Sequence, residues 1–184
     1  MKRCLRLFNG FLTLPVLVVV LTLAAGCATS AESKRKKELS SLLIHVEAVP
    51  GAGGSTSISV IRSSPMKLTI QRDPVIDEGN VAAAMVVDQP GGFALEIQLD
   101  RRGRWILERT TVTDRGRHLA ILSNFGQERW LAAPLITAKI SDGKLVFTPD
   151  ATREEAERIA RGLNNQARKI DRHDNWPFNG PLDR

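Results

Sequence analysis

The chain has 184 residues, of which 42% are hydrophobic and 25% are charged, and its formal net charge at pH 7 is +6. This composition predicts one folded domain or two small ones and excludes an intrinsically disordered chain. Three basic residues, Lys2, Arg3 and Arg6, precede a long uncharged segment, and without them 23 basic and 20 acidic residues remain. Because nucleic-acid binding needs a concentrated basic face, this small excess argues against a nucleic acid as partner.

Residues 1–26 have the pattern of a secretory signal peptide. The three basic residues are followed by a segment from Leu7 to Ala31 without a charged residue, in which Phe11 to Ala25 is strongly apolar. A basic start followed by an apolar core directs a chain into export. An uncleaved transmembrane anchor is the alternative, but an apolar core of about 15 residues is short of the roughly 20 that span a membrane.

Small residues close this apolar segment, in the order Leu23-Ala24-Ala25-Gly26-Cys27. The stretch resembles the lipobox of bacterial lipoproteins, although its Leu lies one residue further from the Cys than in the commonest form. The resemblance implies cleavage between Gly26 and Cys27 and acyl chains on Cys27, enough to anchor the chain stably in a membrane. Ala28 follows the Cys, which favours the outer membrane in enterobacterial sorting. We therefore expect a lipid-anchored, periplasm-facing protein of the cell envelope.

Residues 27–40, which begin with the predicted lipidated Cys, are polar and indicate a tether. Some 13 residues reach at most about 45 Å when extended, so the folded part would stay close to its membrane. The basic run Lys34-Arg35-Lys36-Lys37 could contact anionic headgroups, with a gain of about 1 kcal/mol for each charge near the surface. A solvated spacer is the alternative, and we favour it.

Residues 41–74 predict three short strands that form an extension in front of the main domain. Leu42 to Val49 alternates apolar and polar residues, which is typical of a half-buried strand. Ser57 to Arg62 and Lys67 to Arg72 are two further strand candidates, separated by a Ser-Ser-Pro break.

Residues 75–170 predict an α+β domain. In chain order we expect a hairpin over Ala82–Leu99, a helix over Arg102–Thr113 capped by Asp100, a strand over Arg117–Ser123, a loop over Asn124–Glu128, and a hairpin joining Leu135–Ile140 to Lys144–Thr148. The last helix follows a capping box, Thr152 to Glu155, and carries one apolar stripe of Ala156, Ile159, Ala160, Leu163, Ala167 and Ile170. Residues 171–184 predict a flexible tail. The pattern indicates a largely antiparallel sheet with two helices on one face.

Three stretches between about Lys67 and Leu163 form a recognisable set. They are a strand leading through a Gly into a helix over Phe93–Gly103, the strand Gly116–Ile121, and a run from Ala133-Pro134 through Gly143 and Phe147-Thr148 to Glu154-Glu155-Ala156. Together they resemble the periplasmic head subdomain of SecD, part of the SecDF protein-export factor. Because they are turn and core residues, the resemblance supports a shared fold more than a shared activity.

The resemblance implies a SecDF head-like domain whose periplasmic surface meets emerging polypeptide. SecD also has several transmembrane helices and intramembrane acidic residues for proton coupling. This chain has no apolar span after Cys27, so we do not expect it to transduce a proton gradient.

The sequence carries no familiar catalytic motif. The chain lacks G-x-S-x-G, H-E-x-x-H, a P-loop and a dinucleotide fingerprint. Gly51–Gly54 is glycine-rich, but without the lysine and helix that hold phosphate it predicts a loop. Cys4 would leave with the signal peptide, so Cys27 alone would remain, which excludes a disulfide framework and a metal site built on Cys pairs.

The three histidines are weak candidates for a metal site. His45 and Glu47 share one face of a strand and could supply two ligands, but a third is not visible, and a solvated strand face is the favoured interpretation. His118 is expected at the surface or at a strand edge, and His173 in the tail. We therefore expect neither a metal nor a cofactor.

The aromatic residues divide into two groups. Trp105 and Trp130 are expected in the core or at its rim. Trp176 and Phe178 lie in the predicted tail, where they could dock on the domain or on a partner.

These patterns favour a non-catalytic protein-binding module that is accessory to protein export or to the handling of exported polypeptides. Such a module would use an exposed sheet face or edge to engage its client. A structural envelope lipoprotein, packed against one fixed partner, is the alternative. An enzyme with an unrecognised site is the least favoured interpretation, which a deep pocket lined by His45 or His118 with acidic neighbours would support.

Overall fold

The computed structural model describes residues 32–49, 51, 53–61 and 65–174, of which 171–174 are described as backbone only. The predicted signal peptide, its cleavage site at Gly26 and Cys27, and the tail aromatics Trp176 and Phe178 lie outside the described residues, as does the His173 side chain. Contacts divide the chain into a unit over Met1–Lys37 and a unit over Glu38–Arg184.

In the first unit, residues 32–37 are helical, and Lys36 pairs with Glu32 one turn away at 2.8 Å. Glu32 and Lys36 are both largely exposed, so this ion pair contributes little stability. Every helix in the part of the chain that the structure describes is too short or too polar to span a bilayer.

The described residues of the second unit form eight strands and two longer helices, with a 3-10 turn between β3 and β4. In chain order they are β1 (Ser41–Val46), β2 (Ser55–Val60), β3 (Met66–Gln71), η1 (Glu78–Asn80), β4 (Val81–Gln89), β5 (Gly92–Leu99), α2 (Arg101–Thr113), β6 (Leu119–Asn124), β7 (Glu128–Ala132), β8 (Lys144–Phe147) and α3 (Arg153–Asp174).

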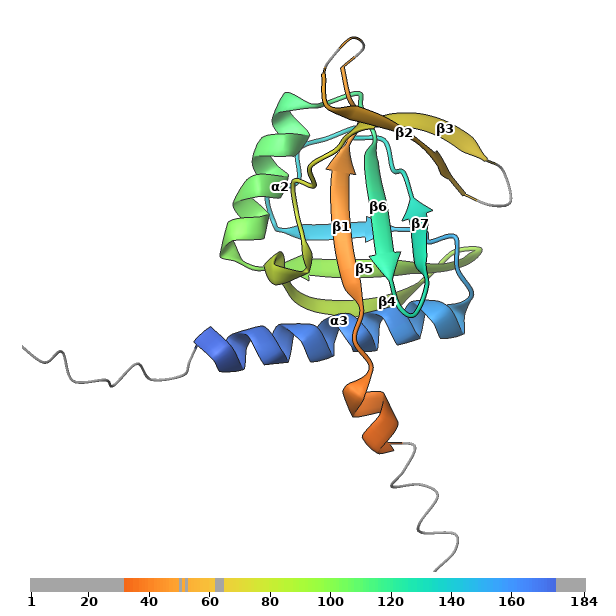
Figure 1. Ribbon diagram of the computed structural model, residues 1–184, viewed down its shortest axis with the longest axis vertical. Helices are drawn as coiled ribbons and strands as arrows, with labels where there is room; N and C mark the ends of the chain where they lie inside the picture. Colours follow the sequence, from red (N-terminus) through yellow and green to blue (C-terminus); the bar gives the residue numbers. More distant parts are fainter. Residues whose placement is uncertain (1–31, 50, 52, 62–64, 175–184) are drawn as a thin grey trace, which may run out of the picture. The chain divides into compact units, whose positions relative to one another are not determined.

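The strands form three antiparallel sheets. Two have three strands, in the orders β1-β6-β7 and β4-β5-β8, and the third is the hairpin β2-β3. Figure 1 shows the strands of β1-β6-β7 running across those of β4-β5-β8, with α3 below. The predicted α+β class with antiparallel pairing is confirmed, although the strands are divided among three sheets.

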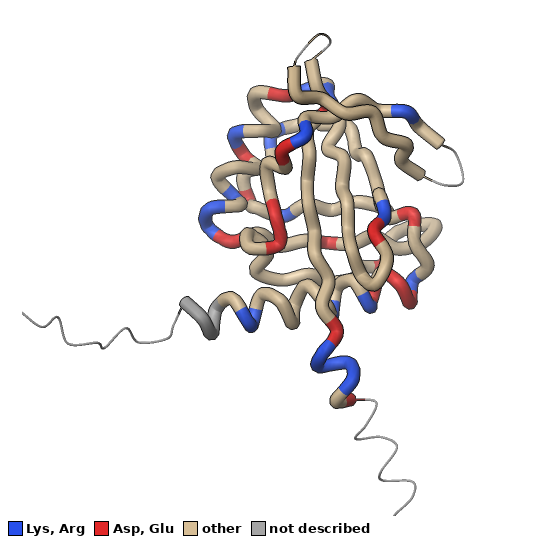
Figure 2. The backbone as a smooth tube through the Cα atoms, in the orientation of Figure 1, with Lys and Arg blue, Asp and Glu red and all other residues tan. Residues whose placement is uncertain are grey.

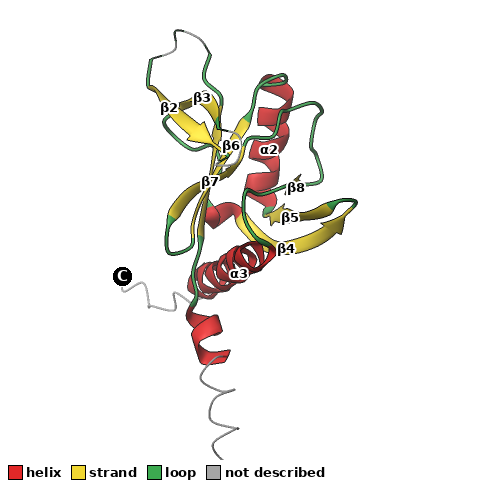
Figure 3. Ribbon diagram, turned by 90° about the vertical axis from the view of Figure 1, so that its right-hand side faces the viewer, coloured by secondary structure: helices red, strands yellow, loops and turns green. Residues whose placement is uncertain are grey.

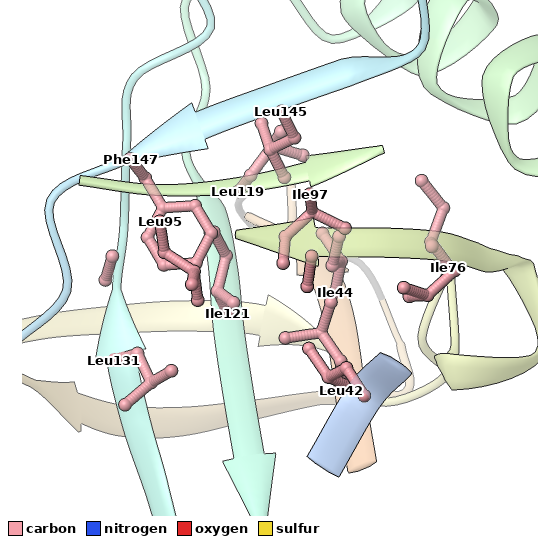
Figure 4. Packing of buried hydrophobic residues seen from close by; sticks show 14 of the residues in the cluster. Leu42, Ile44, Ile76, Leu95, Ile97, Leu119, Ile121, Leu131, Leu145 and Phe147 are labelled. Carbon is pink, nitrogen blue, oxygen red and sulfur yellow. The ribbon is translucent and has the colours of Figure 1, made fainter. Parts of the chain in front are cut away.

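One hydrophobic core fills the space between the two three-stranded sheets. Alternate residues of each strand point into it, because successive side chains of a strand face opposite ways. Its fully buried side chains, several of which Figure 4 labels, include Leu42, Ile44, Ile76, Leu95, Ile97, Leu107, Ile121, Leu131, Ile159 and Leu163. Both sheets and both helices contribute to this one cluster, so neither sheet would keep its buried face without the other.

α2 begins where the sequence predicts. The Asp100 side chain accepts a hydrogen bond from the Gly103 amide at 2.6 Å and so caps the helix. Gly103 is buried, and a Cβ there would lie only 2.8 Å from the Asn80 Cβ, so the absent side chain lets α2 approach η1. The inner face of the helix buries Leu107 and Thr111.

The capping box that opens α3 is also confirmed. The Glu155 amide donates to Thr152 Oγ1, and the Thr152 amide donates to the Glu155 carboxylate. The predicted apolar stripe packs against β4, with Ile170 only partly buried. Gly162 lies against the start of β1, where a Cβ would approach the Ser40 amide nitrogen to 2.7 Å.

α3 also closes the outer edge of β4. The Asn164 carboxamide accepts a hydrogen bond from the Ala84 amide at 2.9 Å and donates to the Ala84 carbonyl at 2.8 Å. One side chain thus satisfies both main-chain groups of an edge-strand residue, as a neighbouring strand would.

Residues 41–74 differ from the predicted extension. β2 and β3 do form a separate hairpin, which Figure 3 shows on the opposite side of β1-β6-β7 from α2 and β5. β1, however, pairs with β6 along its whole length and buries Leu42, Ile44 and Val46 in the main core. Burial of these three side chains makes β1 part of the central structure.

The predicted second hairpin, over residues 135–148, is wrong. Only Leu135 makes a bridge, to His118, and β8 pairs with β5 instead. The tight turn itself is present, with Gly143 at φ +76°. The strand β7 was missed, because the sequence predicts a loop over 124–128 and no element immediately after it.

Replacement of Asn164 should destabilise the unit. Asn164→Ala leaves the Ala84 amide and carbonyl without their partner, at an expected cost of about 1–3 kcal/mol in the free energy of unfolding. Asn164→Asp keeps the shape of the side chain but places a carboxylate oxygen against the Ala84 carbonyl, which also can only accept. Its loss in free energy of unfolding should be smaller at acid pH, where the protonated carboxyl can donate to that carbonyl. Chemical denaturation measures both effects. Arg168→Ala, exposed on the same helix, is the control, and an equal loss there would contradict the assignment.

Candidate functional site

Glu47 and His118, which the sequence analysis treats separately, lie together in the structure. Glu47 follows β1 and His118 precedes β6, so the antiparallel pairing of these strands brings them face to face. The Glu47 carboxylate accepts a hydrogen bond from the His118 amide at 3.0 Å and lies 2.7 Å from His118 Nδ1. The pair therefore joins the end of β1 to the start of β6, its neighbour in the sheet.

This contact changes the acidity of Glu47. Partial burial raises the pKa of its carboxyl, but hydrogen bonds from the side chain and amide of His118 stabilise the carboxylate and outweigh that effect. The charges of His118 and Arg117 act in the same direction, so the pKa of Glu47 lies below its usual range.

His45 is buried, with 6% of its surface exposed, and the solvated position expected for it is wrong. Its Nδ1 lies 3.0 Å from the Gln71 carbonyl oxygen, which can only accept, so Nδ1 carries the proton. The edge of its ring meets Trp130, with centroids 5.5 Å apart. His45 thus attaches the end of β3 to β1, and the hairpin β2-β3 covers its ring.

This arrangement offers no metal site among the residues that the structure describes. No three His, Cys, Asp or Glu side chains of that part of the chain gather into a group that could hold an ion. His45 is hydrogen-bonded to the Gln71 carbonyl. Glu47 is hydrogen-bonded to the amide and the ring of His118, so these three side chains connect separate segments of the chain.

The outer face of β1-β6-β7 is the second candidate. Leu43 lies opposite Leu122, which lies opposite Trp130, so the three form a row across the sheet. All three are half-buried. Figure 1 shows that no helix covers this face below the hairpin β2-β3, and Figure 2 shows no charged residue along β1 or β6.

The hairpin covers the other end of this face. Leu68 and Ile70 of β3 pack on Ala120, with Trp130 at the border of the cluster. A further hydrogen bond, from the Ala48 amide to the Thr69 carbonyl at 2.8 Å, joins β3 to the main chain beyond β1. The row of Leu43, Leu122 and Trp130 therefore begins where the cover of the hairpin ends.

The outer face of β4-β5-β8 has different chemistry. Its corresponding row is Met85, Glu96 and Val146. Met85 and Val146 are exposed, but Glu96 lies between them and pairs with Lys144 at 3.5 Å. An uninterrupted apolar row is thus present on β1-β6-β7 and not on this second sheet face.

The two tryptophans of the described residues differ in their positions. Trp130 is half-buried at the rim of the smaller cluster, as expected. Trp105 projects from α2 with 61% of its surface exposed and is not part of the core. The sequence missed the row of Leu43, Leu122 and Trp130, because strand alternation assigns a face to each residue but does not say which residues lie opposite each other.

Glu47→Gln should remove a pH-dependent part of the stability. Because the folded-state pKa of Glu47 is lowered, its contribution is present above the unfolded value near ~4.3 and is lost as the pH falls through the folded value. At neutral pH we expect the variant to lose about 1 kcal/mol, and the difference from the parent should shrink in acid. Urea denaturation across this range measures it. Glu157→Gln, exposed on α3, is the control, and a difference independent of pH would refute the prediction.

Comparison with known proteins agrees with this fold. The family described as SecDF, P1 head subdomain, matches residues 55–167, which include all the elements from β2 to α3 except the end of that helix. No curated protein matches the chain in sequence.

Two solved structures share the fold. One, a structure of "a membrane component SecDF that enhances protein export", has 18% identity and a TM-score of 0.52, covering 74% of this chain and 67% of that one. A second, SecDF in its Super-membrane-facing form, has 18% identity and a TM-score of 0.54. The similarity covers 74% of this chain but only 20% of that SecDF chain. The family match extends over more than half of the sequence, and this chain therefore belongs to the SecDF P1 head subdomain family.

Proposed function

We propose that the chain is a membrane-anchored, non-catalytic module that binds exported polypeptides and so assists protein export. The observation that carries this proposal is the apolar row of Leu43, Leu122 and Trp130 on the outer face of β1-β6-β7. Family membership supports the connection with export, since a solved relative is a membrane component that enhances protein export.

The chemistry of the row suits an unfolded client. A polypeptide in transit exposes apolar side chains, and their transfer from water onto half-buried Leu and Trp is favourable for many sequences alike. Trp adds contact area at little cost in side-chain entropy. A face without charged residues along β1 and β6 would accept such segments without selecting a particular charge pattern.

The proposal is limited to contact with the polypeptide and includes no proton-driven step. The similarity to the second SecDF structure covers 20% of that chain.

Substitution on the face should weaken binding of an unfolded polypeptide. Leu122→Gln is expected to reduce affinity about tenfold, because the contacts that cost more than about 1 kcal/mol when lost cluster near the centre of an interface. Fluorescence anisotropy with a labelled, permanently unfolded protein measures this on the full chain. Met85→Gln, an exposed change on the other sheet, should leave the affinity unchanged, and equal losses in both variants would refute the assignment.

Crosslinking in cells distinguishes the two non-enzymatic functions. A photoreactive residue at position 122 should capture many exported polypeptides, whereas the same residue at position 85 should not. A single stoichiometric adduct at position 122 would favour a structural lipoprotein with one fixed partner. No adduct at all would argue against both.

Anchoring through Cys27 is part of the same proposal, with the outer membrane favoured over the inner. The motivating feature is the sequence Ala25-Gly26-Cys27 at the end of an apolar segment. Cells grown with labelled palmitate should yield a labelled, shortened chain. Cys27→Ala should abolish the label and leave the leader attached, and incorporation of label into that variant would contradict the site.

A further inference from the structure

The outward face of α2 concentrates positive charge around an exposed tryptophan. At helical spacing, Trp105, Arg109 and Val112 share one stripe, and the Arg109 guanidinium lies 5.7 Å from the centroid of the Trp105 ring. Trp105 is 61% exposed and Val112 57% exposed. The opposite side of the same helix buries Leu107 and Thr111, so the stripe is the side turned away from the core.

Four arginines of this helix remain available to an external anion: Arg101, Arg102, Arg104 and Arg109. In the described part of the chain none of them forms an ion pair. The nearby acids have other partners, since Asp100 caps the helix and Glu108 pairs with Lys139 at 2.6 Å. The four arginines thus have no ion-pair partner in the described unit, although the charge of Arg104 also acts on Glu108.

The surface around Trp105 is hollowed on both sides. An open hollow of about 750 Å³ is lined by Arg101, Arg102, Arg104 and Trp105, together with Asp100 and Glu108. A second, of about 320 Å³, lies between Trp105, Arg109 and Val75. Arginine side chains around an open hollow suit phosphate groups, because the planar guanidinium matches phosphate oxygens in pairs.

We infer that α2 docks the folded unit onto an anionic membrane surface, with lipid phosphates at the arginines and the Trp105 ring at the headgroup level. Trp is enriched at the headgroup level of membranes, and basic residues are attracted to anionic headgroups. This inference goes beyond binding of a polypeptide and uses residues separate from the face of β1-β6-β7.

The dimensions of the stripe favour a lipid surface over a protein partner. From Arg101 to Val112 the helix extends about 17 Å, and with its side chains it is about 10 Å wide. A stable protein interface buries roughly 800 Å² on each partner, several times that area. A lipid surface has no such requirement, because its headgroups rearrange around each side chain.

The test uses the full chain, with its anchor, in vesicles of phosphatidylcholine alone or mixed with phosphatidylglycerol. Trp130→Phe and Trp176→Phe leave Trp105 as the only tryptophan. Because the anchor is the same in both vesicles, the emission of Trp105 reports the position of α2. We expect a shift to shorter wavelength and quenching by brominated lipid only with phosphatidylglycerol, and both effects should be reversed by high salt.

Charge-matched variants identify the surface. The double variant Arg102→Gln with Arg109→Gln should weaken the association of α2 with the anionic surface. We expect its equilibrium constant, read from the Trp105 emission, to fall about fivefold for each arginine removed, because basic residues are attracted to an anionic surface. Lys67→Gln with Arg72→Gln, which removes the same charge from the exposed hairpin β2-β3, should have little effect. Circular dichroism confirms that each variant is folded.

Three outcomes would overturn the inference. One is an equal Trp105 signal in neutral and anionic vesicles, and another is an equal loss in the two double variants. The third is a larger shift with polyglutamate in neutral vesicles than with phosphatidylglycerol, which would indicate an acidic polypeptide as the partner. None of these measurements involves Leu122 or an unfolded client, so their failure is separate from failure of polypeptide binding, and the palmitate label tests the Cys27 anchor by itself.

Discussion

Burial of two crossed antiparallel sheets against each other is the constraint on which the rest of this structure depends. Each three-stranded sheet presents alternate side chains to the shared core, and the fully buried members come from both. A three-stranded sheet by itself has no second layer against which its apolar face can be buried. The inner faces are thus buried in the core, and the surfaces that remain open to a partner are the outer faces of the sheets and the outward side of α2.

On three of the edge strands some main-chain groups are already hydrogen-bonded, which favours a face over an edge as the proposed binding surface. Asn164 occupies the edge of β4, the Ile44 main chain of β1 is hydrogen-bonded to Val75 and Ile76, and the Leu131 carbonyl of β7 accepts from Asp150. Unpaired edges would invite uncontrolled strand addition between chains. An apolar face offers a client contact that depends less on a fixed register, which suits transient binding.

The outer face of β1-β6-β7 and the outward face of α2 have different chemistry. The face of β1-β6-β7 is apolar and uncharged along two strands, and α2 carries arginine around Trp105. A client segment and a lipid headgroup would therefore not compete for the same side chains.

Local features were predictable because their residues are close in sequence. The Asp100 cap, the capping box at Thr152, the apolar stripe of α3 and the β4-β5 hairpin each depend on neighbours a few residues apart, and the structure confirms them. The predicted hairpin over residues 135–148 was wrong, because a local pattern shows where the chain turns but not which strand pairs with which. Its turn at Gly143 is local and real, but β8 has its partner in β5, far earlier in the chain.

The α+β class, the starts of α2 and α3 and the apolar faces of β1 and β5 were determined by the sequence alone, because periodicity and capping are local properties. Only the tertiary structure decided which residues meet. Glu47 and His118 are 71 positions apart, Ala84 and Asn164 are 80 apart, and the row from Leu43 to Trp130 depends on a register that strand alternation leaves open. Register is set by burial of a whole face at once, and that is a property of the assembled core.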